Sequence, residues 1–315
     1  MTMYFKNVYI DKSCSLLGRN EHGVSISADI TIDNYYNNKR SVEEAESSFQ
    51  DLCINRIING DDIDLCISSD LQNQLVASNY AASNYKFPFL TSYSACASFV
   101  SNLIIASSFI QNGLSKVVVC VSSHNLVSEK QYRFPIEYGS IRKYVNTFTA
   151  TGAVSTLVTN KKGVVKVESA TIGKVCDIGY NDVNNFGAIM AHSTFSTIVK
   201  HLKDTNRSSD YYDLVLTGDL GVYGLNILKE CLIDEGISFK SILDAGSLLF
   251  KDSGKSIAGG SGPICLPLIL FNKIFKEDYK RILIVGSGSL HSKNSSSLMK
   301  SIPSISHAVS LEVIK

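Results

Sequence analysis

Hydrophobic residues follow two patterns along this chain: short runs in which nearly every position is apolar, and longer stretches with a helical period. Residues 63–68 and 116–121 are runs of the first kind and predict buried strands. Residues 42–57 and 99–110 have the helical pattern and predict helices. Because strands and helices alternate, we expect an α/β protein whose mostly parallel strands are covered by helices on both faces.

The same order of elements occurs twice. A small-residue turn, an apolar helix and an all-apolar strand occupy residues 96–121, and the same series occupies residues 262–285. This repeat predicts a five-layered α-β-α-β-α fold built from two duplicated halves, residues 1–160 and 161–315. Sites in α/β folds lie at strand ends, where helix N-termini converge.

Cys96 is the first candidate for chemistry at such a strand end. It lies where a predicted strand at residues 86–93 turns sharply into the helix at residues 99–110. A thiol at a helix N-terminus lies in the positive end of the helix dipole, which favours the thiolate. Many condensing enzymes and acyltransferases use a nucleophilic cysteine in this arrangement. The alternative is a small buried residue that the turn tolerates.

Composition narrows the possible functions. Apolar residues make up 44% of the 315 residues, which allows a sizeable core, and a net charge of +1 gives no electrostatic basis for nucleic-acid binding. The longest apolar run, residues 264–271, is far shorter than the roughly 20 residues of a membrane-spanning helix. The eight cysteines form no CxxC pair, so no structural zinc site is expected. We expect a soluble, cytoplasmic protein that needs no cofactor and reaches a membrane only through partners.

Four blocks of sequence resemble the stage V sporulation protein AD family. They are residues 122–139, 170–177, 212–220 and 258–262, and they follow one another in the order that is typical of that family. The duplicated pattern with a cysteine at the turn is similar to the thiolase fold, in the layout of ketoacyl-carrier-protein synthase III. The resemblance runs from about residue 40 to the end of the chain.

The resemblance implies a thiolase-like protein that binds dipicolinic acid (pyridine-2,6-dicarboxylate). Such a protein helps to load this compound, with calcium, into the developing spore, together with membrane-embedded stage V sporulation A proteins. It is not regarded as a working synthase. The resemblance also implies a homodimer, paired near residues 90–94, that is peripherally associated with the inner membrane of the forespore or spore.

The partners of a catalytic cysteine are missing from their usual places. In ketoacyl-carrier-protein synthase III a histidine follows the third strand of the second half, and an asparagine stands in a Gly-Asn pair before the last buried helix. Here the first place has Asp219 and no histidine, and the second reads Gly259-Gly260. Loss of a single oxyanion donor costs about 10²–10³ in rate, and a carboxylate near the thiol disfavours the thiolate. We expect no enzymatic activity; the alternative is an acyltransferase or ketoacyl synthase with Cys96 as nucleophile.

A pocket for a flat aromatic dianion needs cationic or N–H donors for the carboxylates and an apolar slot for the ring. The predicted ligand-binding residues are Cys96, His124, Asn125, Lys130, Arg133, Tyr138, Asp219, Gly260 and Ser261. Some of them have structural alternatives. His124 could be hydrogen-bonded to backbone, Lys130 could be a solvated surface residue, and Arg133 could pair with Glu137 along a helix. Asp219 could cap the next helix or bind a ligand's calcium.

Overall fold

Ten strands lie side by side in one continuous sheet in the computed structural model, which describes residues 1–18, 26–132, 143–250 and 258–314. One half of the sheet has, in spatial order, β5 (Phe89–Thr91), β4 (Leu65–Ser69), β6 (Lys116–Ser123), β8 (Gly152–Thr159) and β2 (Tyr9–Leu17). The other half has β11 (Ile242–Asp244), β10 (Leu214–Thr217), β13 (Arg281–Ser289), β14 (Ser304–Val313) and β9 (Val165–Ile172).

The two halves repeat the same strand directions. In each half the three strands farthest from the junction are parallel, and the last two are antiparallel to their neighbours. The halves join where β2 and β9 pair antiparallel, with Tyr9 opposite Lys166 and Ile10 opposite Val165. The expectation of mostly parallel strands is wrong, and the sheet is mixed. Helices cover both faces, so antiparallel strands are also buried on both sides and read as apolar runs.

Short strands extend this framework. β1 (Thr2–Tyr4) pairs with β9, and β3 (Ile30–Thr31) pairs with β2. β7 (Phe148–Thr149) and β12 (Gly260–Ser261) form a separate parallel pair. This pair links the ends of the two halves, because Phe148 belongs to the first half and Gly260 to the second.

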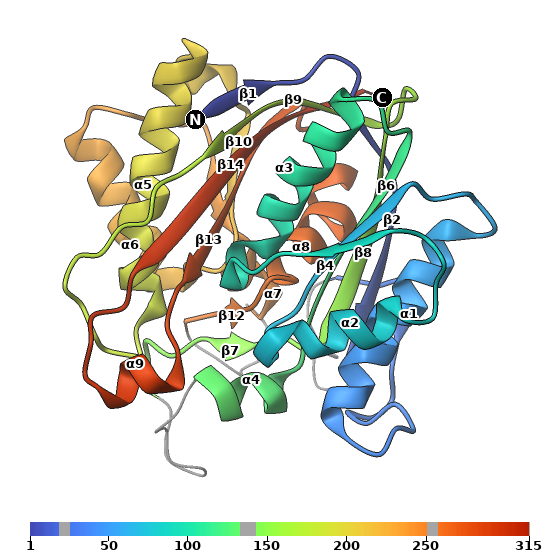
Figure 1. Cartoon of the computed structure of the whole chain (residues 1–315). Helices are drawn as coiled ribbons and strands as arrows, with labels where there is room; N and C mark the ends of the chain where they lie inside the picture. Colours follow the sequence, from blue (N-terminus) through green and yellow to red (C-terminus); the bar gives the residue numbers. More distant parts are fainter. Residues whose placement is uncertain (19–25, 133–142, 251–257, 315) are drawn as a thin grey trace.

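Helices form the other three layers of the fold (Figure 1). α1 (Val42–Ile58) and α2 (Val76–Ala82) lie on one outer side, and α5 (Phe186–Thr205) and α6 (Gly221–Asp234) lie on the other. α3 (Ser98–Gln111), α7 (Ala245–Leu249) and α8 (Cys265–Asn272) lie between the two halves of the sheet. The predicted five-layered fold from two duplicated halves is confirmed.

Three separate apolar cores hold these layers together. The central core joins Leu103 of α3 and Leu268 of α8 to both halves of the sheet. One outer core places Phe49 of α1 against the first half, and the other places Ile189 of α5 against the second. Each core buries apolar surface on both of its layers, which is the main favourable term in folding.

Two short helices lie at the same end of the molecule. α4 (Asn125–Tyr132) follows β6, and α9 (Lys293–Ser297) follows β13, at equivalent places in the two halves (Figure 1). In the described ranges no helix combines the length and the apolar character that crossing a bilayer requires.

Candidate functional site

The turn that carries Cys96 is held in a strained backbone conformation. Cys96 lies in a single helical turn directly before α3, and Ala95 beside it has a φ of 49°. A residue with a Cβ adopts this left-handed conformation only at a cost. The Ser98 hydroxyl fixes the turn, since it donates to the Ala95 carbonyl at 2.7 Å and accepts from the Ser94 amide at 3.2 Å.

Glycines in β13 let the strand approach this turn closely. A Cβ at Gly288 would lie 2.4 Å from the carbonyl oxygen of Ser94, and a Cβ at Gly286 would lie 2.7 Å from Val100 Cγ2. The segment Gly286–Ser289 therefore continues β13 and packs against the start of α3. Tight packing explains the glycines of this segment.

The Cys96 thiol faces a carboxyl group through a shared hydroxyl. Cys96 Sγ lies 3.9 Å from Ser261 Oγ, and that hydroxyl donates to Asp219 Oδ2 at 3.1 Å. The amide of Gly262 also donates to Asp219 Oδ2, at 2.9 Å. The predicted residues Cys96, Asp219, Gly260 and Ser261 are thus brought together at one place, where β12 meets the turn before α3.

Burial controls the charges at this place. Burial, and then the nearby Asp219 carboxyl, raise the pKa of the Cys96 thiol well above its ordinary value. Burial also raises the pKa of Asp219 to about 7. The thiolate that a helix N-terminus favours is therefore opposed by loss of water and by a neighbouring negative charge. A thiol in these surroundings is protonated at neutral pH and is a poor nucleophile.

A small cavity adjoins Cys96. Its volume of about 30 Å³ is lined in part by Tyr93, Tyr132, Phe186 and His291, with the hydroxyls of Ser128 and Ser289. Both serine hydroxyls are buried, and neither finds a hydrogen-bond partner among the residues that the structure describes. The volume is about that of one water molecule. A flat aromatic diacid does not fit in the cavity in this conformation.

A larger open groove lies directly outside the cavity. It has a volume of about 570 Å³, and Tyr93, Tyr132 and His291 line both spaces. Two lysines, Lys130 and Lys293, also line the groove. Its volume is in the range of sites for small ligands, about 300–1,000 Å³.

Two tyrosines form the wall between groove and cavity. The hydroxyl of Tyr93 donates to that of Tyr132 at 3.1 Å, and the Tyr132 hydroxyl donates to the carbonyl oxygen of Leu71. The Nε2 atom of His291 lies 2.9 Å from the carbonyl oxygen of Tyr132. Because a carbonyl only accepts, this nitrogen carries the proton. Movement of the tyrosine rings would join the two spaces.

His124 and Asn125 lie at the start of α4 and line neither space. His124 is fully buried, its Nε2 lies 3.0 Å from the carbonyl oxygen of Tyr35, and its Nδ1 accepts from the Leu126 amide at 3.2 Å. Burial lowers the pKa of His124 to about 4. The backbone N–H of Asn125 donates to Thr151 Oγ1 at 3.1 Å. The contacts of His124 are those of the structural alternative, a histidine held by backbone groups.

The other predicted residues have varied positions. Lys130 lines the groove and also forms an exposed ion pair with Glu43, at 3.5 Å. Arg133 and Tyr138 lie outside the described residues. The helix cap that was considered for Asp219 is made by another residue, Asp244, whose carboxylate accepts from the amides at the start of α6.

Sequence reasoning missed His291, Tyr93 and Lys293 as lining residues. His291 follows the end of β13, whose place in the second half corresponds to that of β6, and His124 directly follows β6. The internal repeat was therefore the signal that could have pointed to His291.

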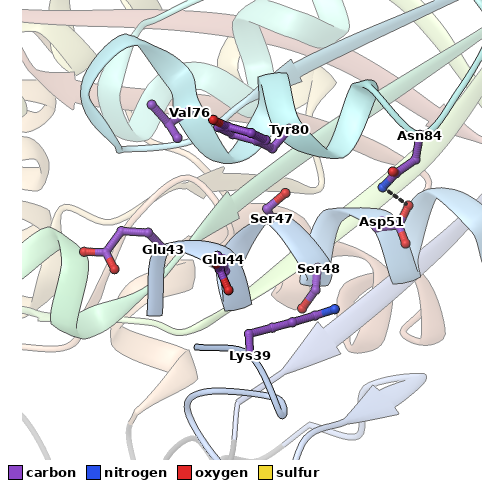
Figure 2. Close-up of a pocket in the computed structure, with 9 residues that line it drawn as sticks. All are labelled: Lys39, Glu43, Glu44, Ser47, Ser48, Asp51, Val76, Tyr80 and Asn84. Carbon is purple, nitrogen blue, oxygen red and sulfur yellow. Dashed lines mark hydrogen bonds between the residues drawn. The ribbon is translucent and has the colours of Figure 1, made fainter. Parts of the chain in front are cut away.

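Another hollow lies on the outer side of the first half, between α1 and α2 (Figure 2). It has a volume of about 440 Å³, and Glu43, Glu44 and Asp51 lie on its α1 wall. Three carboxylates oppose binding of a dianion. This hollow also shares no lining residue with the cavity at Cys96.

Comparison with known proteins identifies the family of this chain. The family model of Stage V sporulation protein AD (SpoVAD) matches residues 1–312, so the resemblance begins earlier than residue 40. The protein named Stage V sporulation protein AD from Bacillus subtilis (strain 168) is 35% identical over 295 residues, which are 90% of this chain and 87% of that protein.

Solved structures share the fold at low sequence identity. 3-Oxoacyl-[acyl-carrier-protein] synthase III from Aquifex aeolicus VF5 has a TM-score of 0.61 and 15% sequence identity, over 97% of this chain and 99% of that chain. An OleA variant from Xanthomonas campestris has a TM-score of 0.63 and 15% identity, over 98% of this chain and 99% of that chain. PksG, an HMG-CoA synthase from Bacillus subtilis, has a TM-score of 0.61 and 13% identity, over 98% of this chain and 80% of that chain. The fold is thiolase-like, and the chain belongs to the Stage V sporulation protein AD (SpoVAD) family.

Proposed function

We propose that this chain is a non-enzymatic binding protein for dipicolinic acid that assists uptake of this compound into the developing spore. The observation that carries the proposal is the groove outside the Cys96 cavity, which combines two lysines with aromatic walls. A flat aromatic ring packs against Tyr93 and Tyr132, and the two carboxylates face Lys130 and Lys293. The groove lies at the strand ends, and α/β folds bind their ligands at strand ends.

The chemistry at Cys96 supports a binding role over a catalytic one. A nucleophilic cysteine in acyl transfer needs a lowered pKa or a base, and donors for the oxyanion. Here the thiol pKa is raised, and its neighbour through Ser261 is the Asp219 carboxyl. A carboxylate at this place repels the negative charge that develops on a carbonyl oxygen.

Calorimetric titration of the purified protein with dipicolinic acid, with and without calcium, tests the proposal. We expect saturable binding that weakens about tenfold or more in Lys130→Ala and in Lys293→Ala, because each variant removes a charge-assisted contact. Lys240→Ala is the matched control, since Lys240 forms an exposed ion pair with Asp213 and does not line the groove. Absence of binding heat in the wild type would contradict the proposal.

One observation favours the alternative of an acyltransferase: His291 lines the same cavity as Cys96. A histidine within reach of a cysteine can act as its base. The alternative predicts a mass increase of the intact protein after incubation with an acyl-coenzyme A, and loss of that increase in Cys96→Ala. An unchanged mass in the wild type excludes it.

The proposal extends to partners. We propose a homodimer that pairs through β5, an edge strand of the sheet on which Leu90 is exposed. The other partners are membrane-embedded stage V sporulation A proteins, which would hold the chain at the spore membrane and receive dipicolinic acid, with or without calcium.

A further inference from the structure

Two segments that lie far apart in the sequence form an exposed apolar patch beside α9. One segment leads from β9 toward α5, and the other follows α9 (Figure 1). The Ser301 hydroxyl donates to Asp177 at 2.7 Å, and the Ile302 amide donates to the Tyr180 carbonyl at 2.8 Å, so the segments are neighbours. The exposed side chains of this α9 patch are Val175, Ile178, Tyr180, Leu298 and Met299.

Leu298 and Met299 are the outermost members of the α9 patch. Leu298 is 67% exposed and Met299 is 75% exposed. Met299 also has a φ of 52° at the end of α9, where the amide of Lys300 donates back to the carbonyl of Ser295. Glycine or asparagine usually occupies this left-handed position. A methionine at this position is therefore unfavourable, because its apolar side chain is exposed to water and its backbone is left-handed. Contact of the side chain with an apolar surface of another molecule would offset that cost.

Each of the two segments has a lysine next to an apolar residue of the patch. Lys174 precedes Val175, and Lys300 follows Met299; both lysines are exposed. Two aspartates lie in the segment before α5. Asp177 accepts hydrogen bonds from Ser301, which ties the two segments together, and from the Gly179 amide, and Asp182 accepts from the Asn184 amide. Aliphatic side chains flanked by lysines match the boundary between the acyl chains and the anionic headgroups of a lipid bilayer.

The small size of the α9 patch favours a bilayer over a protein as its binding partner. A stable protein interface takes about 20–30 residues on each side, whereas this patch has five large apolar side chains. A bilayer needs no matching pocket, and its attraction for a protein grows with the apolar area buried and with the charge of basic neighbours. We infer that the α9 patch binds the surface of an anionic lipid bilayer directly, with Leu298 and Met299 inserted among the headgroups.

This contact would orient the ligand groove. His291, Ser292 and Lys293 line the groove and lead directly into α9, which ends at the patch. A chain that rests on a bilayer through Leu298 and Met299 therefore holds the mouth of the groove near the membrane. The inference goes beyond dipicolinic acid binding and does not depend on it.

Flotation of the purified full chain with lipid vesicles tests the inference. The vesicles are made of phosphatidylcholine alone or of phosphatidylcholine mixed with phosphatidylglycerol, at low and at high salt. We expect binding to the mixed vesicles that falls as salt rises, because the lysine contribution is screened. The double variant Leu298→Ser with Met299→Asn should bind at least about tenfold more weakly. Asparagine tolerates the left-handed backbone of Met299 and preserves the fold.

Two further variants sharpen the result. Lys174→Glu with Lys300→Glu should weaken binding to the mixed vesicles by about tenfold or more and leave residual binding to phosphatidylcholine unchanged. Ile233→Ser is the control, because Ile233 is 71% exposed on α6 and lies outside the patch. Failure of the wild type to float with mixed vesicles at low salt would overturn the inference. So would full binding by the Leu298 and Met299 double variant, or flotation only after a membrane protein is added to the vesicles.

Discussion

Cys96 and Asp219 both contact one buried hydroxyl, that of Ser261, which is 3.9 Å from the sulfur and donates to the carboxylate at 3.1 Å. The carboxyl follows β10, the strand after which the resemblance to ketoacyl-carrier-protein synthase III would place a histidine. The pair therefore places an acid beside a thiol in a site where acyl transfer would need a base.

Replacing Asp219 with asparagine should make the Cys96 thiol more acidic. The carboxylate raises the thiol pKa, and its own pKa of about 7 means that its charge is largest above pH 7. We expect Asp219→Asn to speed alkylation of Cys96 by iodoacetamide several-fold at pH 8 and less at pH 6. Mass spectrometry of the labelled peptide measures the rate, and the partly exposed Cys231 serves as internal reference. Equal rates in both proteins would refute the role of Asp219.

Opening the tyrosine wall should expose the same thiol. Tyr132 joins Tyr93 to the Leu71 carbonyl and separates the groove from the cavity at Cys96. We expect Tyr132→Ala to increase Cys96 alkylation by about tenfold or more, because the loss of the ring merges the two spaces. Tyr80→Ala, at an exposed ring of the hollow between α1 and α2, should leave the rate unchanged. An unchanged rate in Tyr132→Ala would mean that the thiol is reached by another path.

Because β13 lies so close to the strained turn, an alanine should destabilise the fold at Gly288 and not at Gly218. A methyl group at Gly288 would lie 2.4 Å from the Ser94 carbonyl, whereas one at Gly218 would meet no atom nearer than 3.8 Å. We expect Gly288→Ala to lower the free energy of unfolding by about 1–3 kcal/mol and Gly218→Ala to have little effect. Denaturant unfolding measures both variants. Similar stabilities would show that the turn can shift away from β13.

The buried carboxyl of Glu46 should make the free energy of unfolding fall as pH rises. Glu46 of α1 accepts from Gln72 and Ser122, and burial, followed by the nearby Asp70 carboxyl, raises its pKa to about 8. The folded state therefore holds a proton that the unfolded chain releases near its usual pKa of 4.5. By linkage, the contribution of Glu46 to stability decreases from about pH 4.5 to pH 8.

Glu46→Gln removes this titration and tests it. Relative to the wild type, the variant should gain stability as pH rises from 5 to 8, by about 1 kcal/mol or more. Thermal unfolding at several pH values measures the difference. Parallel pH profiles in the two proteins would show that Glu46 titrates normally in the fold.

The proposed dimer predicts sensitivity at the β5 edge. Leu90 lies on β5 and is 44% exposed. Leu90→Lys should convert a dimer to a monomer in light scattering after size exclusion, since a charge on an edge strand opposes pairing. Ile233→Lys on α6 is the control. A wild type that is monomeric at high concentration would remove the homodimer from the proposal.

Much of the fold could be predicted from the sequence, because local hydrophobic patterns and an internal repeat specify it. Apolar runs identified the strands, helical spacing identified α1 and α3, and the recurrence of the series at residues 96–121 and 262–285 identified two halves. The pairing of Cys96 with Asp219 also followed from comparing one chain position with the layout of a known fold. Strand direction did not follow, because burial on both faces gives the same apolar run in either direction.

The sequence by itself determined the layers, the duplication and the position of the cysteine at a strand end, since these depend on residues close together in the chain. Only the tertiary structure decided which side chains share a space. His124 follows its strand immediately, yet backbone groups hold it in a buried place, whereas His291 from the other half of the chain lines the cavity. Contacts between distant segments depend on how the layers pack, and a single sequence records that packing only indirectly.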